Sequence, residues 1–206
     1  ELRSPVPSDD DIDQADYDLK LRPEREFQLP ENFWSVTKLR YRLARQDGPA
    51  PLIFIISGTG ASYASGKTEE LKRLFYGAGY HVVQLSSPTS YDFMSAASRA
   101  ATPGISSEDA EDLYGVMMAV RAQHPDLQAT EYNLTGYSLG GLHAAFVSKL
   151  DESLRSFNFK HVLLLNPPVN LYTSVSNLDR LVQSETRGVT SKTTYFELVL
   201  GKLTRY

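Results

Sequence analysis

The chain has 206 residues, 41% of them hydrophobic, which is enough to bury a sizeable core and fits a single domain. Its 25 acidic and 21 basic residues give a formal charge of −4, so we expect no nucleic-acid partner. The absence of cysteine excludes disulfides, thiolate nucleophiles and cysteine zinc sites. It also means that cysteine usage does not indicate whether the protein works in an oxidising or a reducing compartment. The longest apolar run spans residues 51–56, far short of the roughly 20 residues that cross a bilayer, so no transmembrane segment is expected.

The first segment of the chain, residues 1–33, is acidic. Six aspartates fall between residues 8 and 18 with few apolar residues among them, a composition typical of solvated segments. We therefore expect residues 1–33 to form a flexible N-terminal arm.

Three of these aspartates, Asp9, Asp11 and Asp13, have the alternate spacing of a calcium-binding loop. Such a loop needs glycine at its sixth position and glutamate at its twelfth, where this chain has Gln14 and Lys20. We therefore expect no metal site here, and no other pattern in the chain implies a metal or an organic cofactor.

Beyond residue 33, segments that favour strands alternate with segments that favour helices. Strands are expected at 34–43, 52–56, 81–85, 132–135 and 161–165, and helices at 69–76, 107–123 and 139–150. This alternation predicts an α/β fold with a doubly wound, mostly parallel sheet over residues 34–170. It stops after Asn166, and two further helices near 177–183 and 194–203 indicate a helical cap or lid over residues 171–206.

The chemistry is concentrated in the sequence Gly136-Tyr137-Ser138-Leu139-Gly140. Here a strand must turn at once into a helix with the serine at the apex, and the two small glycines leave room where a Cβ would clash. This motif resembles the nucleophile elbow of the α/β-hydrolase superfamily, which includes lipases, esterases and thioesterases. The resemblance covers about residues 36–170 and implies that Ser138 is a catalytic nucleophile.

A glycine-rich loop follows the strand at 52–56, where such hydrolases carry one donor of the oxyanion hole. By that resemblance the backbone N–H groups of Thr59 and Leu139 would stabilise a tetrahedral oxyanion. Ser57 stands where many relatives have histidine, so Gly60 remains the alternative donor.

The same loop also matches a relaxed phosphate-binding pattern that ends in Gly66-Lys67-Thr68. In a phosphate-binding loop the strand runs directly into the first glycine, whereas here residues 57–60 intervene. No later apolar strand ends in an aspartate that could help hold magnesium. A nucleotide-binding function is therefore only the third hypothesis.

A serine hydrolase needs a base and an orienting acid, which in this superfamily follow the serine in the order acid, then histidine. Only two histidines follow Ser138. His143 lies on the same expected helix and His161 opens a strand, so both are expected to be structural. The nearest downstream acids, Asp151 and Asp179, do not follow a strand in the required way, and we assign neither to catalysis.

The strands that carry the acid and the histidine in the superfamily are missing after the expected cap. We therefore expect either that the parent protein continues past Tyr206 or that the chain is a catalytically inactive relative. The leading hypothesis is a serine hydrolase that cleaves an ester or thioester through an acyl-enzyme on Ser138, and the alternative is a non-catalytic binding module of the same fold. A small-molecule or lipid-like acyl compound is the expected substrate. Six apolar cap residues could line its pocket, although core packing explains them equally well: Tyr195, Phe196, Leu198, Val199, Leu200 and Leu203.

Overall fold

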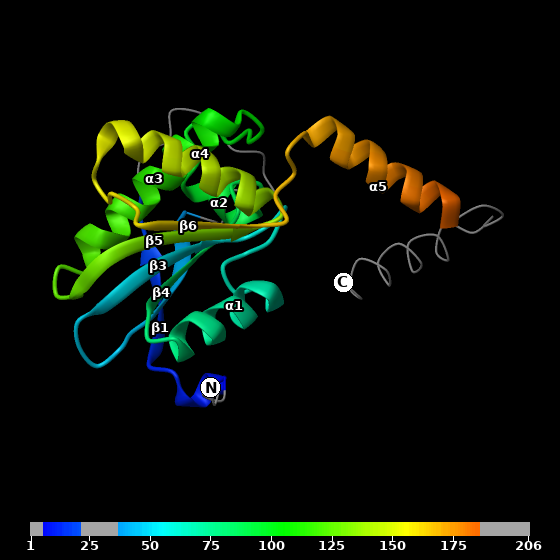
Figure 1. The fold of residues 1–206 in the computed structure, drawn as a ribbon. Coiled ribbons are helices and arrows are strands. Elements are labelled where there is room, and N and C mark those ends of the chain that lie inside the picture. Colours follow the sequence, from blue (N-terminus) through cyan, green and yellow to red (C-terminus); the bar gives the residue numbers. More distant parts are fainter. Residues whose placement is uncertain (1–5, 22–36, 186–206) are drawn as a thin grey trace. The chain divides into compact units, whose positions relative to one another are not determined.

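The computed structural model of the chain describes residues 6–21 and 37–185. The chain divides into two units, residues 1–167 and 168–206. The first contains η1 (Asp9–Asp11), β1 (Gln14–Leu19), β2 (Leu39–Ala44), β3 (Ala50–Ile56), α1 (Gly66–Gly77), β4 (His81–Leu85), α2 (Tyr91–Ala96), α3 (Ser106–Gln123), β5 (Ala129–Tyr137), α4 (Leu139–Leu154) and β6 (His161–Leu165) (Figure 1). The second contains α5 (Leu171–Glu185).

The six strands form one sheet in the order β1-β2-β4-β3-β5-β6. Strands β4, β3, β5 and β6 run parallel to one another, while β2 is antiparallel to both β1 and β4. Helix α1 covers one face of the sheet, and α3 and α4 cover the other (Figure 1). This arrangement confirms the expected doubly wound, mostly parallel α/β architecture. Because the sheet is parallel at its centre, the carboxyl ends of β3, β4, β5 and β6 lie at one edge, where ligands of such sheets bind.

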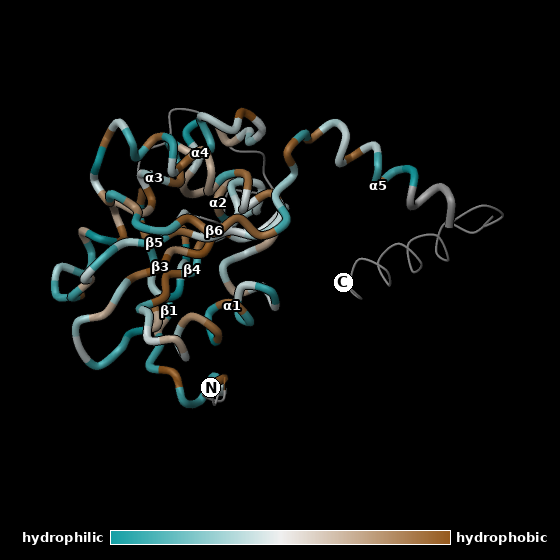
Figure 2. Tube along the Cα trace, in the orientation of Figure 1, coloured by the Kyte–Doolittle hydropathy of each residue, from teal (hydrophilic) through white to brown (hydrophobic). Residues whose placement is uncertain are grey.

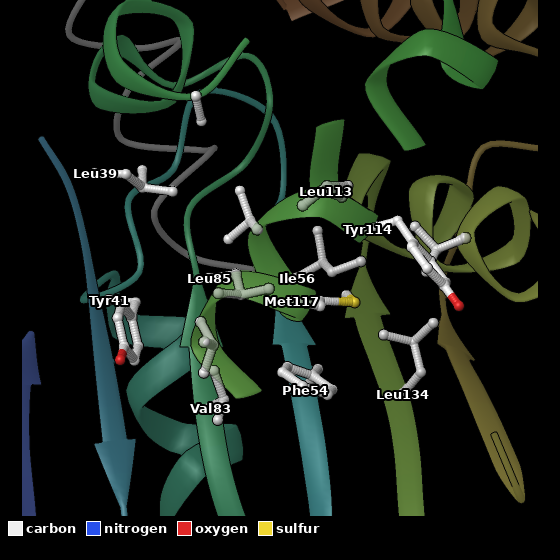
Figure 3. Packing of buried hydrophobic residues seen from close by; sticks show 14 of the residues in the cluster. Leu39, Tyr41, Phe54, Ile56, Val83, Leu85, Leu113, Tyr114, Met117 and Leu134 are labelled. Atoms are coloured by element: carbon white, nitrogen blue, oxygen red, sulfur yellow. The ribbon is translucent and has the colours of Figure 1, made fainter. Parts of the chain in front are cut away.

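Alternate residues of the central strand β3 contribute to two separate cores. Phe54 and Ile56 pack with residues of α3 such as Met117 (Figure 3), whereas Ile53 and Ile55 pack with Leu71 of α1. The hydrophobic colouring is concentrated on the central strands (Figure 2). A strand covered on both faces must be apolar at every position, which is why 52–56 forms a continuous hydrophobic run.

The N-terminal segment differs from the expected solvated arm over its described residues. Strand β1 pairs in register with β2, which places Asp16 opposite Arg42 and Asp18 opposite Arg40. The two pairs form ion pairs of 2.6 and 3.3 Å. Two of the six aspartates therefore pair with basic residues across the strands rather than standing in a solvated arm. Residues 22–33 of the expected arm lie outside the described residues.

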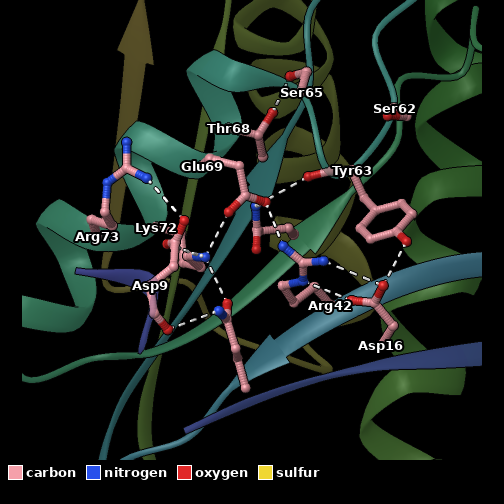
Figure 4. Close-up of polar contacts among 12 residues, drawn as sticks. Asp9, Asp16, Arg42, Ser62, Tyr63, Ser65, Thr68, Glu69, Lys72 and Arg73 are labelled. Carbon is pink, nitrogen blue, oxygen red and sulfur yellow. Dashed lines mark hydrogen bonds and ion pairs between the residues drawn. The ribbon is translucent and has the colours of Figure 1, made fainter. Parts of the chain in front are cut away.

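A buried lysine also ties the N-terminal segment to helix α1 (Figure 4). The side chain of Lys72 is fully buried and forms ion pairs with Glu69 at 2.6 Å and with Asp9 at 2.9 Å. It donates a third contact, of 2.6 Å, to the side-chain oxygen of Gln14. A buried ammonium ion needs such partners because desolvation is otherwise too costly. Asp9 is thus used in an ion pair rather than in a calcium loop.

Most element boundaries agree with the expectations from sequence. The strands at 81–85 and 161–165 have the expected bounds, whereas the strand expected at 34–43 is described as 39–44. Helix α2 was not expected, and α5 extends on both sides of the expected 177–183. The second expected cap helix, 194–203, lies outside the described residues. No described helix is long and apolar enough to cross a membrane.

Candidate active site

The backbone at Ser138 has a conformation that residues with side chains rarely adopt. Its φ is 53° and its ψ is −128°, at the junction where β5 ends and α4 begins. Such a residue carries backbone strain of about 1–3 kcal/mol, which persists only where the surroundings enforce it. The strain projects the serine from the carboxyl edge of the sheet.

Close backbone contacts enforce this turn. A Cβ on Gly136 would lie 2.2 Å from the carbonyl oxygen of Gly140, and a Cβ on Gly140 would lie 2.3 Å from that of Ile56. Neither distance is compatible with a side chain, so only glycine allows the strand, the helix and the neighbouring strand to approach so closely. The two glycines of the motif therefore have the role that the sequence predicted.

The Ser138 side chain is exposed, and its hydroxyl makes no hydrogen bond with any described residue. Its backbone N–H donates to the carbonyl of Leu165 at 2.9 Å, which ties the turn to the end of β6. The hydroxyl stands at the N-terminus of α4, where unpaired N–H groups favour a developing negative charge. The arrangement suits a nucleophilic hydroxyl.

The loop after β3 packs directly against this turn. Gly58 is buried, and a Cβ there would lie 2.7 Å from the ring of Tyr137. The Tyr137 hydroxyl is 2.9 Å from that of Ser65 at the start of α1. The glycine-rich loop and the elbow therefore form one contiguous surface, as the sequence order predicted.

The two candidate donors of this loop differ in their contacts. Gly60, with φ +66°, donates its N–H to the hydroxyl of Thr89 at 2.8 Å. Among the described residues, neither the N–H of Thr59 nor that of Leu139 has an acceptor. The Thr59 and Leu139 amides are thus free to bind a ligand, whereas the Gly60 amide is occupied. Thr89 was missed from sequence, although it follows β4 and therefore lies at the same edge of the sheet.

The phosphate-loop pattern is used for internal structure. The Thr68 side chain is buried, and its hydroxyl lies 2.6 Å from that of Ser65 and 2.9 Å from that of Ser57. Lys67 pairs with Glu70 at 2.6 Å on the exposed side of α1. Because neither side chain is directed to a common anion site, the structure gives no support to nucleotide binding.

Two histidines mark the amino end of the parallel strands, the edge opposite Ser138. His161 opens β6 opposite Asn133 and His81 opens β4. Ser138 lies five residues beyond Asn133, which corresponds to roughly 15 Å along the sheet. Burial lowers the pKa of His81 below its usual value. Neither histidine is near enough to take a proton from Ser138.

The other two histidines are buried away from the serine. The Nε2 of His124 lies 2.6 Å from the Tyr41 hydroxyl, and its Nδ1 lies 2.9 Å from the Arg45 guanidinium. Burial, together with the nearby Arg45 charge, lowers the pKa of His124. His143 is 1% exposed, and its Nε2 lies 3.5 Å from an oxygen of Asp109 on α3. It packs inside the helical layer, whereas the Ser138 side chain is exposed.

The downstream acid Asp151 is structural. It is buried at the end of α4, where it accepts hydrogen bonds from the hydroxyl of Tyr114 at 2.5 Å and from the N–H groups of Phe157 and Phe159 at 3.0 and 3.2 Å. Asp179 lies on α5 in the C-terminal unit. Within the described residues, no group of three or more acidic or histidine side chains could hold a metal ion.

No family model matches the sequence, and a search of curated proteins gives no match. Solved structures do match. Brefeldin A esterase, a bacterial homologue of human hormone-sensitive lipase, aligns with a TM-score of 0.56 at 14% identity over 85% of this chain and 47% of its own. An esterase of Pyrococcus furiosus aligns with a TM-score of 0.61 at 12% identity over 89% of this chain and 62% of its own.

Fungal esterases of Rhizomucor miehei align with a TM-score of 0.51 at 18% identity over 83% of this chain and 49% of the fungal chain. The chain thus spans about half to three-fifths of the length of these enzymes. At such low identity the likeness establishes architecture alone. Together with the strand order and the strained turn at Ser138, it shows that this chain has the α/β-hydrolase fold.

Proposed function

We propose that Ser138 is the nucleophile of a hydrolase that cleaves a carboxylic ester or a thioester. One observation carries the proposal: a serine whose exposed hydroxyl is bound by no described residue stands at a strained strand-to-helix turn. A strained backbone is retained where a function requires it, and an exposed hydroxyl is accessible to a substrate. The esterases to which the fold is similar support the same reaction class.

The proposed reaction is a two-step acyl transfer. The Ser138 oxygen attacks the carbonyl carbon, a base takes the hydroxyl proton, and the carbonyl oxygen becomes an oxyanion. The free N–H groups of Leu139 and Thr59 donate hydrogen bonds to this oxyanion. The tetrahedral intermediate collapses to an acyl-enzyme as the alcohol or thiol leaves with a proton, and water then releases the acid in the same way.

The base is the incomplete part of the site. All four histidines of the chain are described, and none of them reaches the Ser138 hydroxyl. The proposal therefore requires a base that none of these four histidines supplies, together with an acid that orients it. A small-molecule or lipid-like acyl compound is the proposed substrate, although the apolar cap residues at 195–203 that could line its pocket lie outside the described residues.

Covalent labelling with a fluorophosphonate tests the proposal, because this reagent reacts with an activated serine. The 206-residue chain and the full-length protein are each incubated with the reagent and analysed by intact mass. Ser138→Ala removes the proposed nucleophile. Ser107→Ala, which removes an exposed serine at the start of α3, is the matched control.

We expect the full-length protein and its Ser107→Ala variant to gain one adduct each and Ser138→Ala to gain none. Labelling that persists in Ser138→Ala would contradict the assignment. Absence of labelling in the full-length wild type would favour the non-catalytic binding module, a reading that the remote histidines also support.

A further inference from the structure

The loop that follows β4 lies against the glycine-rich loop of the candidate site. Its Thr89 accepts the hydrogen bond from the N–H of Gly60, and the N–H of Ser87 donates to the carbonyl of Ala61 at 3.0 Å. Two loops from the carboxyl ends of adjacent strands, β3 and β4, are thus joined at two points. This contact brings a hydroxyl to the edge of the oxyanion loop.

The direction of one hydrogen bond follows from burial. The hydroxyls of Ser87 and Thr89 are 2.9 Å apart, and the Ser87 hydroxyl also accepts the N–H of Thr89 at 3.3 Å. Ser87 is fully buried, and among the described residues the Thr89 oxygen is the one acceptor within reach of its hydroxyl proton. A buried donor without an acceptor is costly, so Ser87 donates to Thr89.

This direction leaves Thr89 with a free proton. Its oxygen has two lone pairs, and these accept the Gly60 N–H and the Ser87 O–H. No described residue accepts the Thr89 proton, and the side chain is only partly buried. Thr89 therefore has a hydrogen-bond donor that no described residue uses. Because two donors already bind its oxygen, cooperative polarisation makes this O–H a stronger donor than an isolated hydroxyl.

We propose that the Thr89 hydroxyl is a further oxyanion donor. The Gly60 amide donates to Thr89 and so cannot bind the oxyanion itself, and the Thr89 O–H would donate to the oxyanion in its place. The proposal rests on the ester-hydrolase function proposed for Ser138. Thr59 and Gly60 are adjacent, so their Cα atoms are about 3.8 Å apart, and the Thr89 oxygen is 2.8 Å from the Gly60 nitrogen. The hydroxyl is therefore close enough to the Thr59 amide for both to reach one substrate oxygen.

The loop also adjoins the nucleophile. Gly58, one residue before Thr59, is in contact with Tyr137, which immediately precedes Ser138. An acyl carbonyl held at Ser138 would thus have Leu139 on one side and the Thr59 amide with the Thr89 hydroxyl on the other. The ligand class is a carbonyl compound whose oxygen gains negative charge during the reaction.

Three variants of the full-length protein test the proposal. Thr89→Val keeps the shape of the side chain and removes the hydroxyl, and Thr89→Ser keeps the hydroxyl. Thr89→Cys offers only a weak S–H donor and provides a second removal variant if valine perturbs the fold, which thermal unfolding reports. Each variant is assayed for kcat and KM on a p-nitrophenyl ester and on the matching thionoester, whose sulfur is a weaker acceptor.

We expect Thr89→Val and Thr89→Cys to lower kcat for the ester by roughly 10- to 100-fold with little change in KM, because loss of one oxyanion donor costs on the order of 100-fold or more. Thr89→Ser should stay within about threefold of wild type, and the preference for ester over thionoester should fall in Thr89→Val and Thr89→Cys but not in Thr89→Ser.

Other outcomes overturn the proposal. A kcat of folded Thr89→Val or Thr89→Cys within twofold of wild type, or equal losses in Thr89→Ser and Thr89→Val, would remove Thr89 from the oxyanion site while Ser138 still reacts with fluorophosphonate. An equal loss on the ester and the thionoester would assign Thr89 to loop structure alone. Failure of the full-length wild type to label at Ser138 would instead reject the hydrolase function, and the Thr89 role with it.

Discussion

Gly140→Ala tests the close approach of the end of β3 to the turn at Ser138. The φ of Gly140 does not lie in the left-handed region, so alanine is opposed there by contact alone. Its Cβ would lie 2.3 and 2.5 Å from the carbonyl oxygens of Ile56 and Ser57. The shorter contact must lengthen by about 1.1 Å to reach an ordinary 3.4 Å, and both partners are backbone atoms of packed elements.

Such overpacking costs about 2–3 kcal/mol of unfolding free energy, measured by urea titration with circular dichroism. The same displacement should abolish fluorophosphonate labelling at Ser138, because it separates the proposed oxyanion donors from the proposed nucleophile. The control is Gly115→Ala on the exposed side of α3, where a Cβ meets no atom within 4 Å. Alanine should stabilise that helix by about 0.5–1 kcal/mol. A loss of less than about 0.5 kcal/mol in Gly140→Ala would refute the steric account, since core insertions normally cost more.

Three further predictions concern charged groups in the same unit. Lys72→Met should lower the unfolding free energy by about 2 kcal/mol, because Glu69 and Asp9 each lose a charge-assisted contact with the buried ammonium, although Glu69 keeps Arg42 and Gln84 and Asp9 keeps Arg73. Lys67→Met removes an exposed pair and should cost less than about 0.5 kcal/mol in the same urea titration. Equal losses in the two lysine variants would contradict the role of burial. Asp151→Asn should lower the unfolding free energy by about 2–3 kcal/mol, because three donors lose a carboxylate acceptor. Fluorophosphonate labelling of the folded variant should be retained, and its loss would show that Asp151 acts in the site. Because the pKa values of His81 and His124 are lowered in the folded protein, the unfolded chain binds protons more readily than the folded one. The free energy of unfolding should therefore be highest above the unfolded pKa of 6.5 and should decline as the pH falls below it. Urea titrations at pH 7.5 and 5 measure this decline, and equal free energies at the two pH values would count against it.

Much of the central architecture follows from local sequence patterns. The continuous hydrophobic run of β3 is long enough to indicate a strand buried on both faces, and its alternation with amphipathic helices indicates a parallel sheet. The strained strand-to-helix turn at Ser138 was also predictable, because its glycines and serine lie within five residues of one another and impose their geometry locally.

The expectation of a flexible N-terminal arm was wrong for residues 14–19, which form strand β1, and the reason is physical. Its aspartates look solvated when considered alone, because composition does not reveal a partner strand. Asp16 pairs with Arg42, which lies 26 residues further along the chain, and this contact depends on the register between β1 and β2. Charge complementarity between distant segments is therefore not visible in a local window.

The sequence by itself determined the order of the central strands and of helices α1, α3 and α4, and the position of the nucleophile candidate, because these depend on short-range periodicity and on adjacent residues. Only the tertiary structure decided which amides of the loop after β3 have an acceptor among the described residues. The Gly60 amide donates to Thr89, 29 residues away, whose hydroxyl lies 2.9 Å from that of Ser87. Hydrogen-bond satisfaction in a buried loop is a property of all the groups that surround it, and those groups meet only when the sheet has assembled.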